Sequence, residues 1–222
     1  MAAQAAGQAA IALAPMTERI VRRPGKELRD RLVATLLLVP TAPVLVLCAG
    51  AIKLEGLLDR RARGPVFFAE HRVSRGEIFE LLKFRTLTRD ALAELGPGPT
   101  HIKPLEAAHT TRIGKLLKQW YLDELPQLIN IARGDMLLIG TRPWPLDAYE
   151  AEVAQGITRK RDMPAGLIGP VQGAKGRGSK TDRELDAEYW HAYTTYPWWR
   201  LFALDLRIVW DSVRTVFQHK GL

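Results

Sequence analysis

Several features of common protein classes are missing from this sequence. A single cysteine, Cys48, occurs in 222 residues, so an internal disulfide framework and a thiolate metal cluster are both excluded. The five histidines are scattered without the spacing of zinc ligands, and no Gly-x-Ser-x-Gly nucleophile elbow is present. The chain also lacks internal repeats and low-complexity tracts. Its one cysteine fits a reducing compartment.

Acidic residues are fewer than basic ones. The sequence has 24 Asp and Glu against 32 Lys and Arg, which gives a formal net charge of +8 and an isoelectric point near 9.8. Such an excess favours a polyanionic partner, which would be nucleic acid, an anionic membrane surface or a phosphorylated substrate. The mean hydropathy of −0.10 excludes a polytopic membrane protein, and a hydrophobic content of 47% suits one packed domain.

Charge is absent altogether from one stretch, Leu32–Ile52. Its 21 residues match the length that a helix needs to cross a bilayer core of about 30 Å. The stretch starts late and is followed by Lys53 and Glu55 instead of a small-residue cleavage site, which argues against a secretory signal peptide.

Two features complicate a straight span. Pro40 and Pro43 lie near the middle of the stretch, where each removes a backbone donor. Basic residues predominate in both flanks, 17–31 and 53–63, and positive residues favour the cytoplasmic side of a membrane. A helix that breaks at the prolines and returns to the same leaflet satisfies both observations. A kinked spanning helix and a buried core helix remain open from these residues alone.

The remaining pattern predicts an α+β fold with three parts. Residues 1–16 form an uncharged extension, residues 17–63 the basic flank and membrane helix, and residues 64–222 one compact body with a small β-sheet. The expected elements are a turn and strand from Gly64, a strand at Ile78–Phe84, helices at Arg112–Tyr121 and Asp123–Ala132, a strand at Met136–Ile139, and helices at Asp182–Tyr193 and Trp198–Phe217. We expect a loop-rich insertion at Thr88–His109 and a glycine-rich loop without helical period at Pro164–Ser179.

The best-defined candidate catalytic residues are the adjacent pair Asp123 and Glu124. Proline is tolerated in the first turn of a helix, so Pro126 predicts that Asp123 is an N-cap and Glu124 a first-turn residue. A helix N-terminus stabilises carboxylates and bound phosphate. The two carboxylates could divide the work, one as nucleophile or metal ligand and the other as base. The alternative is an ordinary cap with an acidic first turn.

Several cations could recognise phosphate. Arg142 follows a predicted strand, and strand ends commonly host ligands. Lys83 and Arg85 alternate along a strand, which predicts that both lie on one face, either as a phosphate clamp or as a solvated surface. The glycines between Gly166 and Gly178 match neither a P-loop nor a dinucleotide fingerprint.

Tryptophans and arginines are interleaved near the end of the chain. Trp198, Trp199 and Trp210 share the last predicted helix with three arginines. Indole rings favour membrane interfaces, so we expect interfacial helices here. Binding of single-stranded nucleic acid and a plain core helix are the alternatives.

Taken in order, these segments resemble the bacterial sugar transferases known as monotopic phosphoglycosyl transferases. The resemblance covers about residues 26–222, and its stretch Leu122–Asn130 followed by Gly134-Asp135-Met136 is highly specific. The other matching segments are Gly64-Pro65-Val66-Phe67-Phe68 with Arg72-Val73, Lys83-Phe84-Arg85-Thr86-Leu87, Leu138-Ile139-Gly140-Thr141-Arg142-Pro143, a looser Gly166–Arg177, and Leu185-Asp186 through Trp210.

The resemblance implies a reaction. Asp123 would attack the β-phosphate of a UDP-sugar, release UMP and hold a phosphosugar, which polyprenol phosphate (undecaprenyl phosphate) then collects to start a glycoconjugate such as O-antigen, capsule, exopolysaccharide or a glycoprotein glycan. Glu124 would be the base or proton shuttle, and Mg²⁺ beside Asp123 and Glu124 would neutralise the pyrophosphate. The implied substrate-binding residues are Lys83, Arg85, Lys118, Gln127, Thr141, Arg142, Pro143, Gln172, Arg177 and Asp186.

The resemblance also implies a location and a size class. A re-entrant helix, broken at a Ser-Pro pair in the family, would anchor the protein among the phospholipids of the bacterial inner membrane at its cytoplasmic face. We expect a minimal catalytic form without further N-terminal membrane helices. Ala42 stands where the family has Ser before Pro43, and Pro40 would strengthen the break. Lys118 replaces an Arg and Thr141 a Pro.

A rival interpretation is a non-catalytic, basic, membrane-associated protein that binds lipid or nucleic acid. It accounts for the charge and the tryptophans, but it gives no reason for Asp123-Glu124 beside Pro126 or for Arg142. On the transferase interpretation nucleic acid is not a partner. The sequence does not identify the donor sugar, and it leaves a homodimer open.

Overall fold

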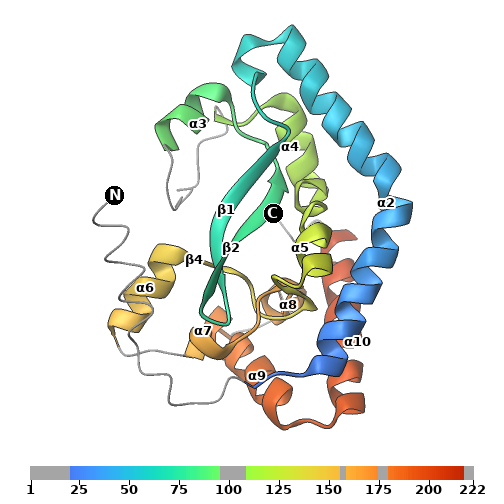
Figure 1. The fold of residues 1–222 in the computed structure, drawn as a ribbon, viewed down its shortest axis with the longest axis vertical. Helices are drawn as coiled ribbons and strands as arrows, with labels where there is room; N and C mark the ends of the chain where they lie inside the picture. Colours follow the sequence, from blue (N-terminus) through green and yellow to red (C-terminus); the bar gives the residue numbers. More distant parts are fainter. Residues whose placement is uncertain (1–20, 96–108, 156–158, 175–179, 218–222) are drawn as a thin grey trace.

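A computed structural model describes residues 21–95, 109–155, 159–174 and 180–217 (Figure 1). The predicted extension 1–16 and the candidate Arg177 lie outside the described residues. The first half of the chain forms α2 (Pro24–Leu58), a 3₁₀ turn η1 (Arg60–Ala62), β1 (Phe67–Ser74), β2 (Glu77–Phe84), α3 (Arg89–Leu95), α4 (Arg112–Gln119) and a 3₁₀ turn η3 (Leu122–Glu124). The second half forms α5 (Gln127–Arg133), β3 (Leu137–Ile139), β4 (Trp144–Pro145), α6 (Leu146–Ala154), α7 (Arg159–Asp162), β5 (Gly166–Ile168), α8 (Pro170–Ala174), α9 (Asp182–Thr195) and α10 (Trp198–Phe217).

The apolar stretch lies in α2, and the predicted break is instead a bend. α2 is one continuous helix of 35 residues that contains Pro40 and Pro43, and Figure 1 shows it changing direction about half-way along. Each proline removes only one N–H from the helical ladder. Beside them the hydroxyl of Thr41 donates to the carbonyl oxygen of Leu37 at 2.7 Å, a bond that is typical of bent helices. The Thr41 hydroxyl reaches the carbonyl of Leu37, whereas the carbonyls that lose their helical donors to the prolines are those of Leu36 and Val39.

Both arms of α2 pack on the same body, while its middle does not. In the first arm, residues 24–38, Ala34 packs against Leu128 and Ile131. In the second arm, residues 45–58, Ile52 packs against Phe84. Between the arms most side chains are exposed. Within the described part of the chain, α2 is the one helix whose length and apolar composition would let it cross a membrane.

The sheets are small. β1 and β2 form an antiparallel hairpin paired from Phe67↔Phe84 to Ser74↔Glu77, and β4 extends it on the side of β1. The two-residue turn is Arg75-Gly76, with φ angles of 51° and 74°. The left-handed conformation is unfavourable for arginine, but the Arg75 guanidinium donates to Glu27 at 2.7 Å. The hairpin tip is thereby tied to the start of α2.

The predicted glycine-rich loop contains regular structure, because its glycines permit close strand packing. β5 pairs in parallel with β3, and α8 follows it within the segment 164–174. A Cβ on Gly166 would lie 2.1 Å from the backbone nitrogen of Gly140, so only glycine allows these strands to approach. The prediction of an irregular loop over this segment was wrong for that reason. The C-terminal helices, in contrast, lie where the pattern predicted them.

A buried cluster of charges joins the first arm of α2 to α10. Lys26 donates to Asp30 at 3.2 Å and to Asp205 at 2.7 Å, and each of these three side chains is at most 4% exposed. Arg29 donates to both carboxylates from the rim. The hydroxyl of Tyr189 donates to Asp205 at 2.9 Å. Asp30 also accepts the backbone N–H of Leu138, which connects the cluster to β3.

The cluster predicts a large cost for removing one carboxylate. Asp205→Ala leaves Lys26 buried with half of its charge partners, and breaking such a buried set costs about 3 to 5 kcal/mol. Glu188→Ala in α9 is the control, because its pair with Lys180 is exposed and such pairs contribute little. Chemical denaturation of the detergent-solubilised protein measures both. An equal, small loss of unfolding free energy in the two variants would contradict the assigned role of the cluster.

Candidate active site

Asp123 and Glu124 lie in a 3₁₀ turn rather than at the start of a helix. α5 begins at Gln127 with Pro126 as its N-cap residue, so the predicted N-cap role of Asp123 was wrong. The chain enters the turn through Tyr121, whose φ of 55° is left-handed. The turn is closed by the N–H of Glu124, which donates to the carbonyl of Tyr121 at 3.3 Å. A strained, non-glycine residue therefore aims the two carboxylates.

Asp123 is buried, and its surroundings perturb it strongly. Its exposed fraction is 8%. Burial and then the charge of Glu124 raise the pKa of Asp123 to about 6, while Lys83 and Lys118 oppose the increase. At pH 7 and above the carboxylate is therefore mainly ionised, although it is far less solvated than a surface carboxylate.

A small polar pocket lies beside the turn. It brings together six of the residues that the sequence singled out, from β2, the turn, α5, the loop after β3 and α8: Lys83, Glu124, Gln127, Arg142, Pro143 and Gln172. Its other lining residues are Arg72, Leu81, Gly166 and Leu167. We call this the polar pocket. Three cations and one carboxylate line it, so it suits a ligand with more than one negative charge.

A buried glutamate organises two of these cations. Glu70 in β1 is 2% exposed and accepts hydrogen bonds from Arg72, one of them 2.9 Å long. The ammonium of Lys83 lies 3.6 Å from Glu70 and 4.0 Å from Glu124. Although burial raises the pKa of Glu70, Lys83 and Arg72 outweigh it and hold that pKa below its ordinary value. Glu70 thus stays ionised and fixes both cations at the pocket.

The opposite wall depends on the close strand pair. Arg142 follows β3 and is exposed, and Gln172 projects from α8. The Gln172 amide nitrogen donates to the carbonyl of Leu167 at 3.4 Å, and its Oε1 is buried without a hydrogen-bond partner among the described residues. A Cβ on Gly169 would lie 2.9 Å from that Oε1. A larger residue at position 169 would therefore displace the Gln172 Oε1, an acceptor atom of a residue that lines the pocket.

A second, apolar cavity of about 410 Å³ adjoins the polar pocket. Four residues line both spaces and form their common wall: Glu124, Arg142, Leu167 and Gln172. The remaining lining comes from the bend of α2 (Leu37, Thr41), the turn and α5 (Tyr121, Leu125, Leu128), the β3–β5 pair (Leu138, Ile168) and α10 (Ser212, Val213, Thr215). We call this the apolar cavity. A charged head and an apolar tail could occupy the two spaces together.

Other candidates lie outside both spaces. The Arg85 guanidinium is 1% exposed and donates to the carbonyls of Ala62, Pro65 and Leu87, so it supports the backbone after β2 and shares no clamp with Lys83. Thr141 is buried and donates its hydroxyl to the carbonyl of Pro164. Asp186 is buried in α9. Lys118 is exposed at the end of α4 and acts on Asp123 through its charge.

Three residues of the site were not predicted. They are Glu70, Arg72 and Tyr121. Polar residues two apart in β1 signalled that Glu70 and Arg72 share a face, but alternation does not reveal that the glutamate is buried. A tyrosine gives no indication of a left-handed backbone, because glycine and asparagine are the residues usually found in that conformation.

The donor set suits a metal that arrives with its ligand. The described residues hold no group of three or more Asp, Glu, His or Cys placed to bind a metal ion. The adjacent carboxylates of Asp123 and Glu124 remain. Mg²⁺ is often held by one or two carboxylates together with waters and substrate phosphates. The site therefore fits Mg²⁺ bound to a phosphate ligand, and it does not fit an all-protein cage.

The raised pKa of Asp123 predicts that this carboxylate destabilises the fold. In the unfolded chain the pKa of Asp123 is near its ordinary value of 3.8, but in the folded chain it is about 6. Stability due to this group is therefore present below pH 3.8 and is lost as the pH rises towards 6. Asp123→Asn should match the parent protein near pH 4 and exceed its unfolding free energy by about 2 to 3 kcal/mol at pH 7.5. Denaturation at both pH values measures this, and a difference that does not vary with pH would contradict it.

Comparisons with known proteins identify the family of this chain. The sequence profile of the family described as "Bacterial sugar transferase" matches residues 21–219. The UDP-glucose:undecaprenyl-phosphate glucose-1-phosphate transferase of Caulobacter vibrioides is 34% identical over 223 residues, which cover 90% of this chain and 77% of that protein. The sugar transferase EpsL of Bacillus subtilis, itself uncharacterised, is 30% identical over 89% of both chains. The exopolysaccharide production protein ExoY of Sinorhizobium fredii is 30% identical over 86% of this chain and 85% of its own. The chain therefore belongs to the bacterial sugar transferase family of enzymes.

Proposed function

We propose that this enzyme transfers a phosphosugar from a UDP-sugar to a polyprenol phosphate, with undecaprenyl phosphate as the acceptor, through a covalent intermediate on Asp123. The observation that carries the proposal is a buried, perturbed carboxylate, Asp123, whose neighbour Glu124 lines both a cationic pocket and an apolar cavity. The Caulobacter relative is named for a reaction between UDP-glucose and undecaprenyl phosphate, which supports both substrate classes.

The polar pocket would hold the pyrophosphate of the donor. Arg72 of β1, Lys83 of β2 and Arg142 after β3 supply positive charge to its walls. Phosphoryl transfer depends mainly on positioning and on stabilisation of the charge that spreads over the phosphate oxygens. Fixed cations serve this purpose without rearrangement, and Glu70 keeps two of them in place. Side chains, rather than a helix N-terminus, would therefore provide the stabilisation.

Asp123 would be the nucleophile. One of its carboxylate oxygens attacks the β-phosphorus, the bond from that phosphorus to the bridging oxygen breaks, and UMP leaves with the bond's electron pair. The ionised form predominates above pH 6, so no base is needed for this step. An oxygen of the polyprenol phosphate then attacks the phosphorus of the adduct and releases the Asp123 carboxylate. Glu124 would take a proton from an acceptor that arrives protonated.

Magnesium would assist the first step. Asp123 and Glu124 would hold Mg²⁺ together with the donor phosphates, and when bound it neutralises charge on the pyrophosphate. Two carboxylates alone are too few to hold Mg²⁺ firmly, and the described residues place no larger group of metal-binding side chains together. Mg²⁺ would therefore bind with the nucleotide rather than before it.

The apolar cavity would hold the first isoprene units of the acceptor. Leu37 and Thr41 at the bend of α2 line its wall, and Val213 of α10 lines it as well. Most side chains at the bend are exposed, and none of them is charged. A lipid could thus pass from a bilayer into the cavity and present its phosphate to Glu124 and Arg142 at the common wall.

The packing of α2 favours a re-entrant position in the membrane. Ala34 in the first arm and Ile52 in the second both contact the body that carries the active site. A spanning helix would place its two ends on opposite sides of the bilayer, whereas these ends meet one body. Basic residues near both ends favour the cytoplasmic side. We therefore place the enzyme at the cytoplasmic face of the bacterial inner membrane, with the bend of α2 inserted among phospholipids.

The proposal predicts a phosphosugar adduct on Asp123. The detergent-solubilised enzyme, given a UDP-sugar and Mg²⁺ without acceptor, should release at most one UMP per active site and gain the mass of the phosphosugar. Asp123→Asn should abolish both, because an amide is a poor nucleophile. Intact-protein mass spectrometry over a panel of UDP-sugars makes the measurement and identifies the donor.

Two results would oppose that prediction. Adduct formation in Asp123→Asn would assign the nucleophile elsewhere. If no UDP-sugar released UMP even with undecaprenyl phosphate present, a non-catalytic lipid- or nucleic-acid-binding role would be favoured. Asp182→Asn is the matched control, because its carboxylate is exposed at the start of α9 and remote in sequence from the turn; it should form the adduct normally.

The assignment of the apolar cavity makes a separate prediction. Val213→Trp fills part of the cavity and should raise the KM for undecaprenyl phosphate on the order of tenfold, or about 1.4 kcal/mol of binding free energy. Adduct formation without acceptor should be unchanged. Leu206→Trp adds the same ring to an exposed position of α10 outside the cavity and should leave both steps intact. Equal effects of the two substitutions would place the acceptor elsewhere.

A further inference from the structure

A third cavity lies apart from the active site, where α2 and α10 begin. Its volume is about 790 Å³, and none of its lining residues lines the polar pocket or the apolar cavity. Four cations and two aromatic rings dominate the lining: Arg22, Arg23, Lys26, Arg29, Trp198 and Phe202. We call this the amino-terminal cleft. The transfer reaction proposed above does not use it.

The floor of the cleft is rigid and its rim is basic. Lys26 and Arg29 are held by Asp30 and Asp205 in the buried charge cluster. Arg22 and Arg23 at the rim have no carboxylate within ion-pair distance among the described residues.

The Arg23 guanidinium instead lies 5.7 Å from the centre of the Tyr193 ring. The described residues also provide no side-chain cap for α2. The cleft therefore has positive charge that nothing in the described structure neutralises.

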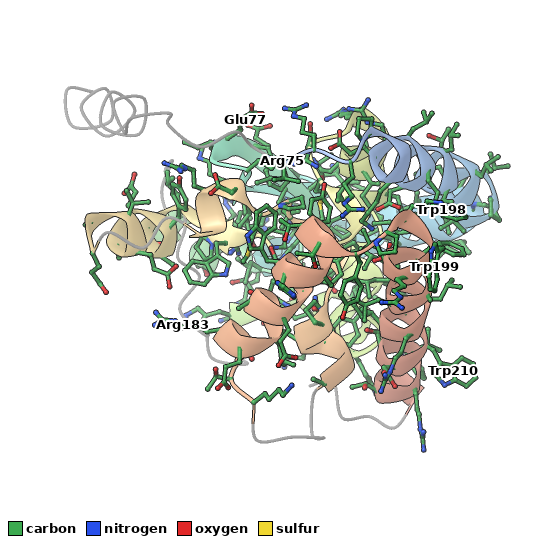
Figure 2. The ribbon with its side chains drawn as sticks, turned by 90° about the horizontal axis from the view of Figure 1, so that it is seen from below. Arg75, Glu77, Arg183, Trp198, Trp199 and Trp210 are labelled. Carbon is green, nitrogen blue, oxygen red and sulfur yellow. The ribbon has the colours of Figure 1, made fainter. Side chains whose placement is uncertain are left out.

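Exposed apolar faces lead away from the cleft. Along α10, Trp199, Phe202, Leu206 and Trp210 follow helical spacing and are 39% to 69% exposed, and Trp198 is 77% exposed. Figure 2 shows Trp198, Trp199 and Trp210 projecting outward along one side of α10. On α2 the exposed series Leu28, Leu32 and Leu36 begins within the segment that lines the cleft and continues beyond it. A ligand that fits both surfaces carries a negative head and long apolar chains.

We infer that the amino-terminal cleft binds the phosphate headgroup of an anionic glycerophospholipid, whose acyl chains lie along the exposed faces of α2 and α10. The inference rests on the membrane position proposed above. The volume is larger than a free phosphate requires. Nucleic acid would gain nothing from the leucines of α2. The acceptor polyprenol phosphate would need to reach Asp123, and this cleft shares no residue with the spaces beside it.

The site can be tested without catalysis. The full chain is purified in an uncharged detergent and titrated with phosphatidylglycerol or phosphatidylcholine that carries brominated acyl chains, which quench nearby tryptophan fluorescence. We expect saturable quenching and a raised melting temperature with phosphatidylglycerol, and much weaker effects with phosphatidylcholine. The double variant Arg22→Gln/Arg23→Gln should bind phosphatidylglycerol about tenfold more weakly or worse.

A matched double variant separates the cleft from general charge. Arg60→Gln/Arg61→Gln removes two exposed charges beyond the other end of α2 and should retain the affinity of the parent protein within about twofold. Trp198→Phe should lose part of the quenching but keep the rise in melting temperature.

Three results would overturn the inference. The first is an equal loss of affinity for phosphatidylglycerol in the two double arginine variants, and the second is no loss of affinity in either variant. The third is displacement of phosphatidylglycerol by inorganic phosphate or by undecaprenyl phosphate at equal concentration. The titration contains no UDP-sugar donor, so a negative result would not affect the outcome of the adduct assay on Asp123.

Discussion

The fold depends on a set of charges that the protein interior would ordinarily exclude. Lys26, Asp30 and Asp205 are buried together, and their bonds connect the first arm of α2 to α10 and to the backbone of β3. Such charges are costly to bury, and their mutual attraction offsets that cost only when the geometry is complete. The cluster therefore fixes the position of α2 relative to α10 and β3. With α2 fixed on α10, its bend comes to lie at the apolar cavity, and β3 comes to lie where Arg142 can follow it.

The candidate active site also contains groups whose placement lowers the stability of the fold but fixes their position. Burial and the charge of Glu124 leave the Asp123 carboxylate poorly solvated and raise its pKa to about 6. The strained Tyr121 precedes Asp123 by two residues, the buried Glu70 faces Lys83, and the unpartnered Oε1 belongs to Gln172 of the pocket lining. Each of these features is unfavourable by itself, and together they form the walls of one site. Local rules of folding are broken here because the site requires fixed charges in a small volume.

Much of this arrangement follows from sequence patterns, and the exceptions have physical causes. The two prolines predicted a change of direction in α2, and the helix bends but stays continuous because each proline removes only one N–H from the ladder. Alternation placed Lys83 and Arg85 on one face, but β2 ends at Phe84, so the rule does not reach Arg85. Pro126 indicated a helix start and located the dyad within a few residues, whereas the left-handed Tyr121 displaced the start to Gln127. Contacts between residues far apart, such as Lys26 with Asp205, are invisible to local pattern.

The distance in sequence between those two residues has a consequence for synthesis. Lys26 and Asp205 are 179 positions apart. When α2 leaves the ribosome, Lys26 and Asp30 have each other but not the partner that comes with α10. Helix α2 can form early, yet its first arm cannot settle into the final arrangement until α10 has been made. Although α2 comes early among the described elements, it is thus among the last of them to reach its final packing.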